Sequence, residues 1–335
     1  MRVLLAICLA LAAAWAGYWF IGSSALKSGL AAWFDARRAE GWVAEYGALQ
    51  VQGFPSRFDT SFTALRLADP AAGLGWQAPF FQLLTLSYTP NHVIAVWPHT
   101  QSITTPGGEF ILSSADMRAS MVVAPSTALA LRRATLTGEA LSLAPHAGAE
   151  GEALSVAALR LAAERIEDGS ADARYHLGLA ATDMAPPAAL MAQLEGSNSV
   201  PRVIDSVAAD ITVDFTAPWD RFAIERARPQ PTRIEIARLA VTWGAMSLEA
   251  SGALDVDARG LPEGDITLKA RGWQDALEIA RSTGALTPDM ADTAQAALSM
   301  MAGGDSALDI PLRLGEGRVW LGPVPIAPAP VLRLQ

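Results

Sequence analysis

The sequence predicts an α+β protein that is predominantly antiparallel β, built as a strongly curved sheet or groove with a few packing helices and preceded by one transmembrane helix. Three observations predict this class. A charge-free apolar run stands near the N-terminus, apolar and polar side chains alternate along much of the remaining chain, and turn residues separate the alternating stretches. Of the 335 residues, 51% are hydrophobic and only 18% charged, whereas soluble proteins carry about 25% charged residues.

The charge and cysteine content exclude several classes of protein. The net charge is −9 and the basic residues are scattered, so we expect no nucleic-acid partner, because phosphate binding needs clustered Lys and Arg. The single cysteine, Cys8, lies in the N-terminal apolar run. The rest of the chain therefore has no disulfide scaffold, no thiol nucleophile and no cysteine-ligated metal.

The first 22 residues are predicted to anchor the chain in a membrane. Val3–Gly22 contains no charged residue, and as a helix it would rise about 30 Å, the thickness of the hydrocarbon core. Aromatic residues cluster at its far end, as in an interfacial belt. The predicted anchor residues are Val3, Leu4, Leu5, Trp15, Trp19 and Phe20.

A cleaved signal peptide is the alternative interpretation of this segment, with Ala14-Trp15-Ala16 as the cleavage site. We favour a retained anchor, because the apolar run continues for six residues past Ala16 and an amphipathic helix follows without a break. Arg2 and the amino terminus favour a cytosolic N-terminus. The expected location is thus the bacterial inner membrane, single-pass, with the bulk of the chain in the periplasm.

Residues 23–41 are predicted to form an amphipathic helix that ends at Gly41. Its apolar face carries Leu26, Leu30, Trp33 and Phe34, followed by Arg37. This face could lie on the membrane surface or pack on the core of the following domain, and we favour packing.

The β-rich periplasmic domain is predicted to occupy residues 42–335, with two possible sub-lobes meeting near 195–201. Its first strands show apolar residues at every second position, and turns are expected at Asp69-Pro70, Thr89-Pro90-Asn91 and Pro106-Gly107-Gly108. The apolar series are Phe58, Thr60, Phe62 and Ala64; Leu84, Leu86 and Tyr88; Val93, Ala95 and Trp97; and Met117, Ala119, Met121 and Val123.

The middle of the chain is less regular. We expect a hairpin of Leu154–Leu161 with Tyr175–Leu179 around Asp168-Gly169, a helix over Pro187–Glu195, and a strand through Ile211–Phe215.

A long hairpin near the C-terminus is the clearest pattern. Residues 246–258 and 266–270 alternate strictly around the turn Gly260–Gly264, which gives the hairpin one apolar and one polar face. An apolar concave face of this kind would be a groove. Its predicted lining residues are Leu248, Leu254, Val256, Ile266 and Leu268.

Two helices and an edge follow this hairpin. Helices are expected over Gln274–Ser282 and from a Thr287-Pro288-Asp289 cap to Gly303-Gly304. A strand through Leu308–Leu314, a turn at Gly315–Gly317 and a returning strand come next, and the proline-rich tail is typical of an extended edge.

No catalytic, cofactor-binding or metal-binding residues are predicted. The histidines His92, His99, His146 and His176 lack metal-site spacing. Asp255 and Asp257 share one face of a strand and could serve as a paired acid and base, but the polar face of the hairpin, with Lys269 or Arg271 opposite, is the favoured interpretation. We therefore expect a protein that is not an enzyme and has no cofactor.

Several short runs carry a resemblance to a known family. They are Gly41-Trp42, Leu49–Phe58, Trp76–Pro79, Tyr88–Pro90, Leu248–Val256, Pro262–Gly264 and Gly322–Pro325. Together they resemble the bacterial domain of unknown function 2125 family, and the late hairpin is also similar to AsmA-like envelope proteins. The AsmA-like resemblance implies an inner-membrane anchor, a β-rich body and a link to lipid handling and outer-membrane assembly. Neither resemblance supplies catalytic residues.

These expectations favour a non-enzymatic, membrane-anchored periplasmic protein whose apolar β groove serves lipid handling or envelope maintenance. Its expected partners are the inner membrane, a lipid or acyl chain, and possible envelope proteins. A structural scaffold that binds other envelope proteins through its sheet edge is the first alternative. A hydrolase with an unrecognised site is the second, and it predicts a polar pocket with a strongly shifted carboxylate or histidine.

Overall fold

The structure, a computed structural model, describes residues 1–146, 153–167, 169, 173–193, 201–225, 227–282, 284, 286–302 and 307–334. It confirms the predicted class, since the described residues form eighteen strands with antiparallel pairing, few helices and an apolar N-terminal helix. Four predicted features fall at least partly outside the described residues: the end of the helix over Pro187–Glu195, the sub-lobe boundary near 195–201, the turn at Asp168, and the helix stop at Gly303-Gly304.

The chain forms two compact units. Unit 1 comprises Met1–Val123 and Leu136–Glu150, and unit 2 comprises Ala124–Thr135 and Gly151–Gln335. Strand β9 (Leu131–Pro145) contributes residues to both units. Each unit is described separately below.

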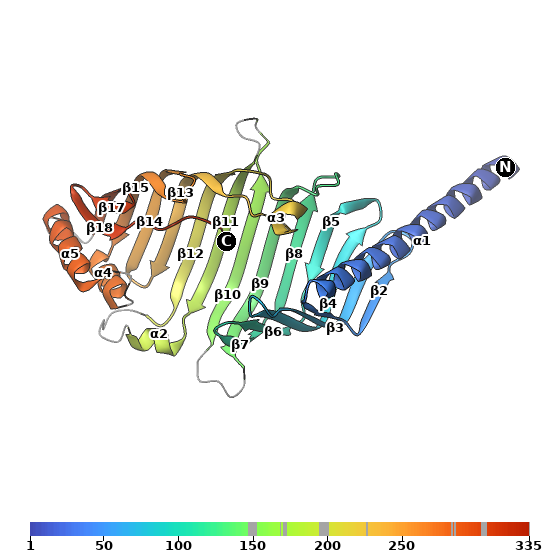
Figure 1. Ribbon diagram of the computed structural model, residues 1–335, viewed down its shortest axis with the longest axis horizontal. Coiled ribbons are helices and arrows are strands. Elements are labelled where there is room, and N and C mark those ends of the chain that lie inside the picture. Colours follow the sequence, from blue (N-terminus) through green and yellow to red (C-terminus); the bar gives the residue numbers. More distant parts are fainter. Residues whose placement is uncertain are drawn as a thin grey trace. The chain divides into compact units, whose positions relative to one another are not determined.

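Unit 1 combines one long helix with antiparallel strands (Figure 1). The strands pair as β1–β3, β2–β3, β3–β4, β4–β5, β4–β6, β5–β8, β6–β7 and β7–β9. The elements are α1 (Arg2–Ala39), β1 (Val43–Glu45), β2 (Ala48–Gln52), β3 (Asp59–Asp69), β4 (Leu74–Leu86), β5 (Thr89–Val96), β6 (Thr100–Thr105), β7 (Gly108–Ser113) and β8 (Asp116–Val123).

Helix α1 contains both the predicted anchor and the predicted amphipathic helix. It runs without interruption to Ala39. Gly41 then stops the helix, because its φ of 90° is in the left-handed region that favours glycine. Phe34 is buried against Ala44, Leu49, Phe62 and Leu65, and Leu30 packs against the same cluster. The core-packing interpretation of this face is thereby confirmed for Leu30 and Phe34, whereas Trp33 is 42% exposed.

Three details of the predicted strands in unit 1 are wrong. The alternation in β3 stops at Ala64, where φ is 47°, so Leu65 rather than Ala64 faces the core. In β4 the residues that join the core are Phe81 and Leu83, which places Leu84 and Leu86 on the other face. The predicted turn at Thr89-Pro90-Asn91 is the start of β5, because the chain turns two residues earlier.

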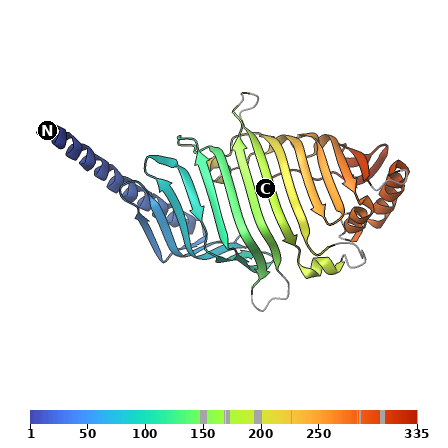
Figure 2. The same ribbon diagram turned by 180° about the vertical axis from the view of Figure 1, so that it is seen from behind.

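Unit 2 is a series of antiparallel strands, each paired with the next in sequence from β10 to β18. Helices α4 and α5 lie together beside the last strands (Figures 1 and 2). The elements are β10 (Leu154–Arg165), β11 (Arg174–Ala185), α2 (Ala188–Gln193), β12 (Ile204–Phe215), α3 (Arg221–Glu225), β13 (Pro231–Trp243), β14 (Met246–Val256), β15 (Pro262–Arg271), α4 (Trp273–Ser282), α5 (Pro288–Ala302), β16 (Ala307–Gly315), β17 (Arg318–Leu321) and β18 (Val324–Pro328).

The predicted strands and helices at the C-terminal end of unit 2 are confirmed. The predicted hairpin is formed by β14 and β15, with Leu248 opposite Ala270 and Val256 opposite Pro262. The backbone N–H of Met290 donates to Thr287 Oγ1 at 3.4 Å, so threonine caps α5 as predicted. Sequence analysis did not predict strand β13, because a register shift between Ile236 and Leu239 interrupts the two-residue period of its apolar side chains.

Candidate functional site

An apolar cavity of about 240 Å³ lies in unit 1 between α1 and the sheet. Leu26 and Leu30 are four residues apart on α1, so they point from the same helix face toward strands β3, β4 and β5. The cavity is lined by Gly22, Leu26, Leu30, Phe58, Thr60, Leu83, Thr85, Pro90 and Val93. It can hold an apolar group far more readily than a charged one.

The two hydroxyl groups of this cavity do little to change its apolar character. Thr85 donates to the carbonyl oxygen of His92 at 2.6 Å, and Thr60 is almost fully buried. Gly22 allows the close approach of α1 that forms one wall, because a Cβ there would lie 2.8 Å from Cζ of Phe58. The helix therefore contacts the strands closely at one side of the apolar cavity.

An aromatic collar joins α1 to the sheet beside this cavity. We define the collar as Trp15, Tyr18, Trp19, Phe20, Phe54 and Phe58. Its rings contact one another: Trp19 lies edge-on to Phe54 at 5.5 Å between centroids, and Phe20 stacks on Phe54 at 5.7 Å. Trp19 is only 6% exposed.

Three collar residues also donate hydrogen bonds to backbone carbonyl oxygens of the sheet loops. Trp15 Nε1 donates to Pro55 at 2.9 Å. The Tyr18 hydroxyl donates to Ser87 at 2.6 Å, and Trp19 Nε1 donates to Arg57 at 2.7 Å. The predicted interfacial belt is thus bound to the body of the protein, whereas Val3, Leu4 and Leu5 are exposed.

The predicted groove residues lie on one face of the β14–β15 hairpin, but they are divided among packed clusters. Leu248 and Leu268 pack around Trp273, Leu298 and Ile310, beside α4 and α5. Leu254 and Ile266 belong to a second cluster with Ile236 and Leu314. Val256 lines a different, polar pocket. The apolar cavity described above is in the other unit.

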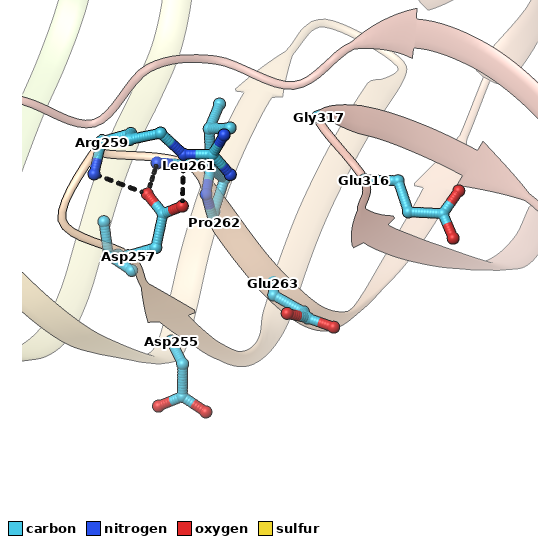
Figure 3. A pocket seen from close by; sticks show the side chains of 9 residues that line it. Asp255, Asp257, Arg259, Leu261, Pro262, Glu263, Glu316 and Gly317 are labelled. Atoms are coloured by element: carbon cyan, nitrogen blue, oxygen red, sulfur yellow. Dashed lines mark hydrogen bonds and ion pairs between the residues drawn. The ribbon is translucent and has the colours of Figure 1, made fainter.

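The polar pocket, of about 420 Å³, lies at the turn of the same hairpin in unit 2 (Figure 3). Its acidic residues are Asp255, Asp257, Glu263 and Glu316. Asp257 accepts hydrogen bonds from the backbone N–H groups of Arg259 and Leu261, both at 2.8 Å. The Leu261 hydrogen bond, with a further contribution from the Arg259 guanidinium, lowers the pKa of Asp257 below its usual value. The Asp257 carboxylate therefore stabilises the turn in which it lies.

Asp255 forms an ion pair with Arg233 on the polar face of the strands. Arg233 donates to Asp255 at 2.9 Å and to Glu235 at 3.1 Å. The hydrogen bond from Arg233 lowers the pKa of Glu235. The predicted partners of Asp255 were wrong, because Lys269 lies opposite Glu249 and Arg271 opposite Ser247, while Glu263 lies opposite Asp255.

The histidines occupy separate positions. His92 Nε2 lies 2.8 Å from Ser120 Oγ, His99 Nδ1 lies 3.0 Å from the Ser114 carbonyl oxygen, and His176 Nε2 lies 2.8 Å from Asp210. Within the described part of the chain, no group of three or more His, Cys, Asp and Glu side chains could hold a metal ion.

Sequence analysis identified Leu26 and Leu30 as an apolar face, but it did not identify the cavity. The other wall comes from three strands, and one of them, β5, pairs with β4 and with the distant β8. A local two-residue period does not specify which strands a helix will cover. No pattern in the sequence therefore indicated the cavity.

The N-terminal helix is the one segment in the described chain that is long and apolar enough to cross a membrane, and a signal sequence would have the same length and composition. Comparisons with curated proteins and with solved structures found no match. A family model described as an uncharacterized protein conserved in bacteria, DUF2125, matches residues 19–330. This match covers most of the chain, including the collar from Trp19 onward and both units, and the chain therefore belongs to the DUF2125 family.

Proposed function

We propose that this protein is a single-pass inner-membrane protein with its bulk in the periplasm, and that its cavity beside α1 binds an acyl chain of a membrane lipid without catalysing a reaction. The observation that carries the proposal is the position of the cavity. Its α1 wall, Gly22, Leu26 and Leu30, begins where the apolar run ends at Gly22. An apolar space at that point is next to the lipid that a retained anchor would span.

The contacts of α1 support retention of the anchor. Cleavage after Ala16 would remove Trp15 and its hydrogen bond to Pro55, and it would leave Tyr18 and Trp19 at a new chain end. Trp19 is buried among Phe54 and Phe58. A signal peptide needs no such contacts with the mature protein, so this packing favours a permanent helix.

The chemistry of the cavity favours an acyl chain over a polar ligand. Leucine, valine, proline and phenylalanine side chains form most of the lining. Transfer of each methylene from water to such a lining contributes about 0.8 kcal/mol. The resemblance of the late hairpin to AsmA-like proteins also supports a role in lipid handling or envelope maintenance.

Filling the cavity tests the proposal. The full chain, purified in detergent, is extracted and its bound phospholipid is measured per chain. We expect Leu26→Trp to lower the bound lipid at least fivefold, because the indole occupies the cavity. Ala25→Trp, at an exposed position on the same helix, is the matched control and should keep the lipid.

Equal lipid in the two variants, with both retaining the unfolding temperature of the parent chain, would contradict acyl binding in this cavity. Recovery of a stoichiometric protein partner and no lipid would instead support the scaffold alternative. Hydrolysis of a lipid ester by the purified chain would overturn the non-enzymatic part of the proposal.

A further inference from the structure

The free part of α1 is too short to cross a membrane alone. The collar contacts begin at Trp15, which leaves the twelve residues Val3–Ala14 free of the sheet loops. A helix of that length rises about 18 Å, whereas the hydrocarbon core is about 30 Å thick. Residues 15–22 must therefore cross the rest of the hydrocarbon core. Because these residues bind the sheet loops, the loops must lie at the same depth in the membrane.

The loops bound by the collar have few unpaired backbone groups. The backbone N–H groups of Ser56 and Arg57 donate to Gly53, that of Phe58 donates to Thr85, and that of Ser87 donates to Ser56. The collar supplies donors for three carbonyl oxygens, at Pro55, Arg57 and Ser87. Irregular backbone can enter an apolar medium only when its polar groups are satisfied in this way.

The same loops expose large apolar side chains. Phe54 is 52% exposed, Leu86 is 37% exposed and Tyr88 is 61% exposed, and Phe20 on α1 beside them is 61% exposed. Aromatic residues of this kind favour the membrane interface, where the ring contacts lipid and the hydroxyl or indole N–H remains hydrated. In water this group would be an apolar patch without a partner.

We propose that Gly53–Phe58 and Leu86–Tyr88 form a membrane foot that is inserted into the periplasmic side of the bilayer that α1 spans, at the depth of residues 15–22. The inference rests on the retained anchor of the proposed function and does not require that the cavity bind lipid. Insertion of the foot lets residues 15–22 supply the length that Val3–Ala14 lacks, and it fixes unit 1 directly at the membrane.

The charged residues at the foot are compatible with this position. Arg57 pairs with Asp59 at 2.7 Å, and its side chain is more than half exposed. A long arginine side chain can extend from a shallow depth to the phosphate layer. Asp59 begins β3 and is therefore on the body side of the foot.

Depth measurements with single cysteines test the foot. In a Cys8→Ser background, Phe54→Cys and Tyr88→Cys each carry an environment-sensitive fluorophore, and the full chain is reconstituted into phosphatidylethanolamine and phosphatidylglycerol vesicles. Nitroxide-labelled lipids should quench both probes at least threefold more than they quench a control probe. Aqueous iodide should quench the control probe more strongly.

Leu74→Cys is the matched control. Leu74 is 53% exposed, similar to Phe54, and it begins the strand whose other end is Leu86. Twelve residue steps along a strand span about 40 Å. Trp19 of α1 contacts Phe58, which directly precedes β3, and Phe34 farther along α1 contacts Phe62 within β3. The helix and the strand therefore both run away from the foot.

Flotation of the same vesicles separates the two proposals. If the chain floats with lipid while the Phe54 and Tyr88 probes respond like the Leu74 probe, the foot is wrong and the anchor stands. If the chain does not float, the anchor fails and the foot with it. Tyr88 is outside the collar, so its probe reports depth even if substitution of Phe54 loosens the collar.

Discussion

Gly22 decides how closely α1 approaches the sheet. It is located between the collar and the cavity, and its Cα faces the ring of Phe58. At two other glycines of the helix, Gly17 and Gly29, a Cβ would meet no neighbouring atom within 4 Å. The three glycines therefore share a helical backbone but differ in their surroundings.

We expect Gly29→Ala to stabilise the protein by about 0.5–1 kcal/mol, because alanine has the higher helix propensity and meets no neighbour. Gly22→Ala should be destabilising relative to Gly29→Ala by about 1–3 kcal/mol, since its Cβ overlaps Phe58. Chemical denaturation in detergent, followed by tryptophan fluorescence, measures both. Equal stability of the two variants would show that Phe58 moves aside freely.

At the scale of single elements, the turn after β14 is held by one carboxylate. Asp257 binds two backbone N–H groups of its own turn and the guanidinium of Arg259 at 3.1 Å. Gly260 in this turn has φ of 84°, and its carbonyl oxygen accepts a hydrogen bond from Leu332 at 2.7 Å. The turn therefore connects the hairpin to the C-terminal segment.

The lowered pKa of Asp257 predicts a pH dependence of stability. A carboxyl group with a lower pKa in the folded state stabilises the protein above its unfolded pKa, near 4, and this stabilisation is lost as the pH falls through the folded pKa. The difference in unfolding free energy between the parent chain and Asp257→Asn should thus shrink below about pH 4. Denaturation curves at several pH values measure it.

Glu263→Gln, in the same pocket, controls for the general loss of a negative charge. A difference between the parent chain and Asp257→Asn that stays constant between pH 7 and pH 3 would contradict the role of the ionised Asp257 in the turn.

At the scale of the whole molecule, α1 belongs to the packed structure of unit 1. The helix supplies Phe34 to the core of unit 1, Leu26 and Leu30 to the cavity, and Trp19 to the collar. In the proposed membrane-anchored protein, this continuous helix would join the anchor to unit 1 without a flexible linker.

We therefore expect the protein isolated from native membranes to keep its N-terminus. Mass spectrometry of its peptides should recover residues that precede Gly17, Trp15 among them. A soluble species that begins at Gly17 would show that Ala14-Trp15-Ala16 is a cleavage site. A Trp15→Phe variant should still be membrane-bound, since the apolar run is unchanged.

The sequence by itself determined the elements whose signals are local. The alternation of residues 246–271, the cap at Thr287 and the stop at Gly41 each depend on neighbouring residues, and all three are present in the structure. The length of the apolar run likewise identified a helix that could span a membrane.

Only the tertiary structure decided which elements meet. Arg233 on β13 reaches Asp255 on β14, β5 pairs with β8 past an intervening hairpin, and the tryptophans of α1 bind carbonyl groups some forty residues away. The cavity and the collar arise from these contacts. The physical reason is that periodicity records which face of an element is apolar, whereas the partner of that face is selected by packing between segments far apart in the chain.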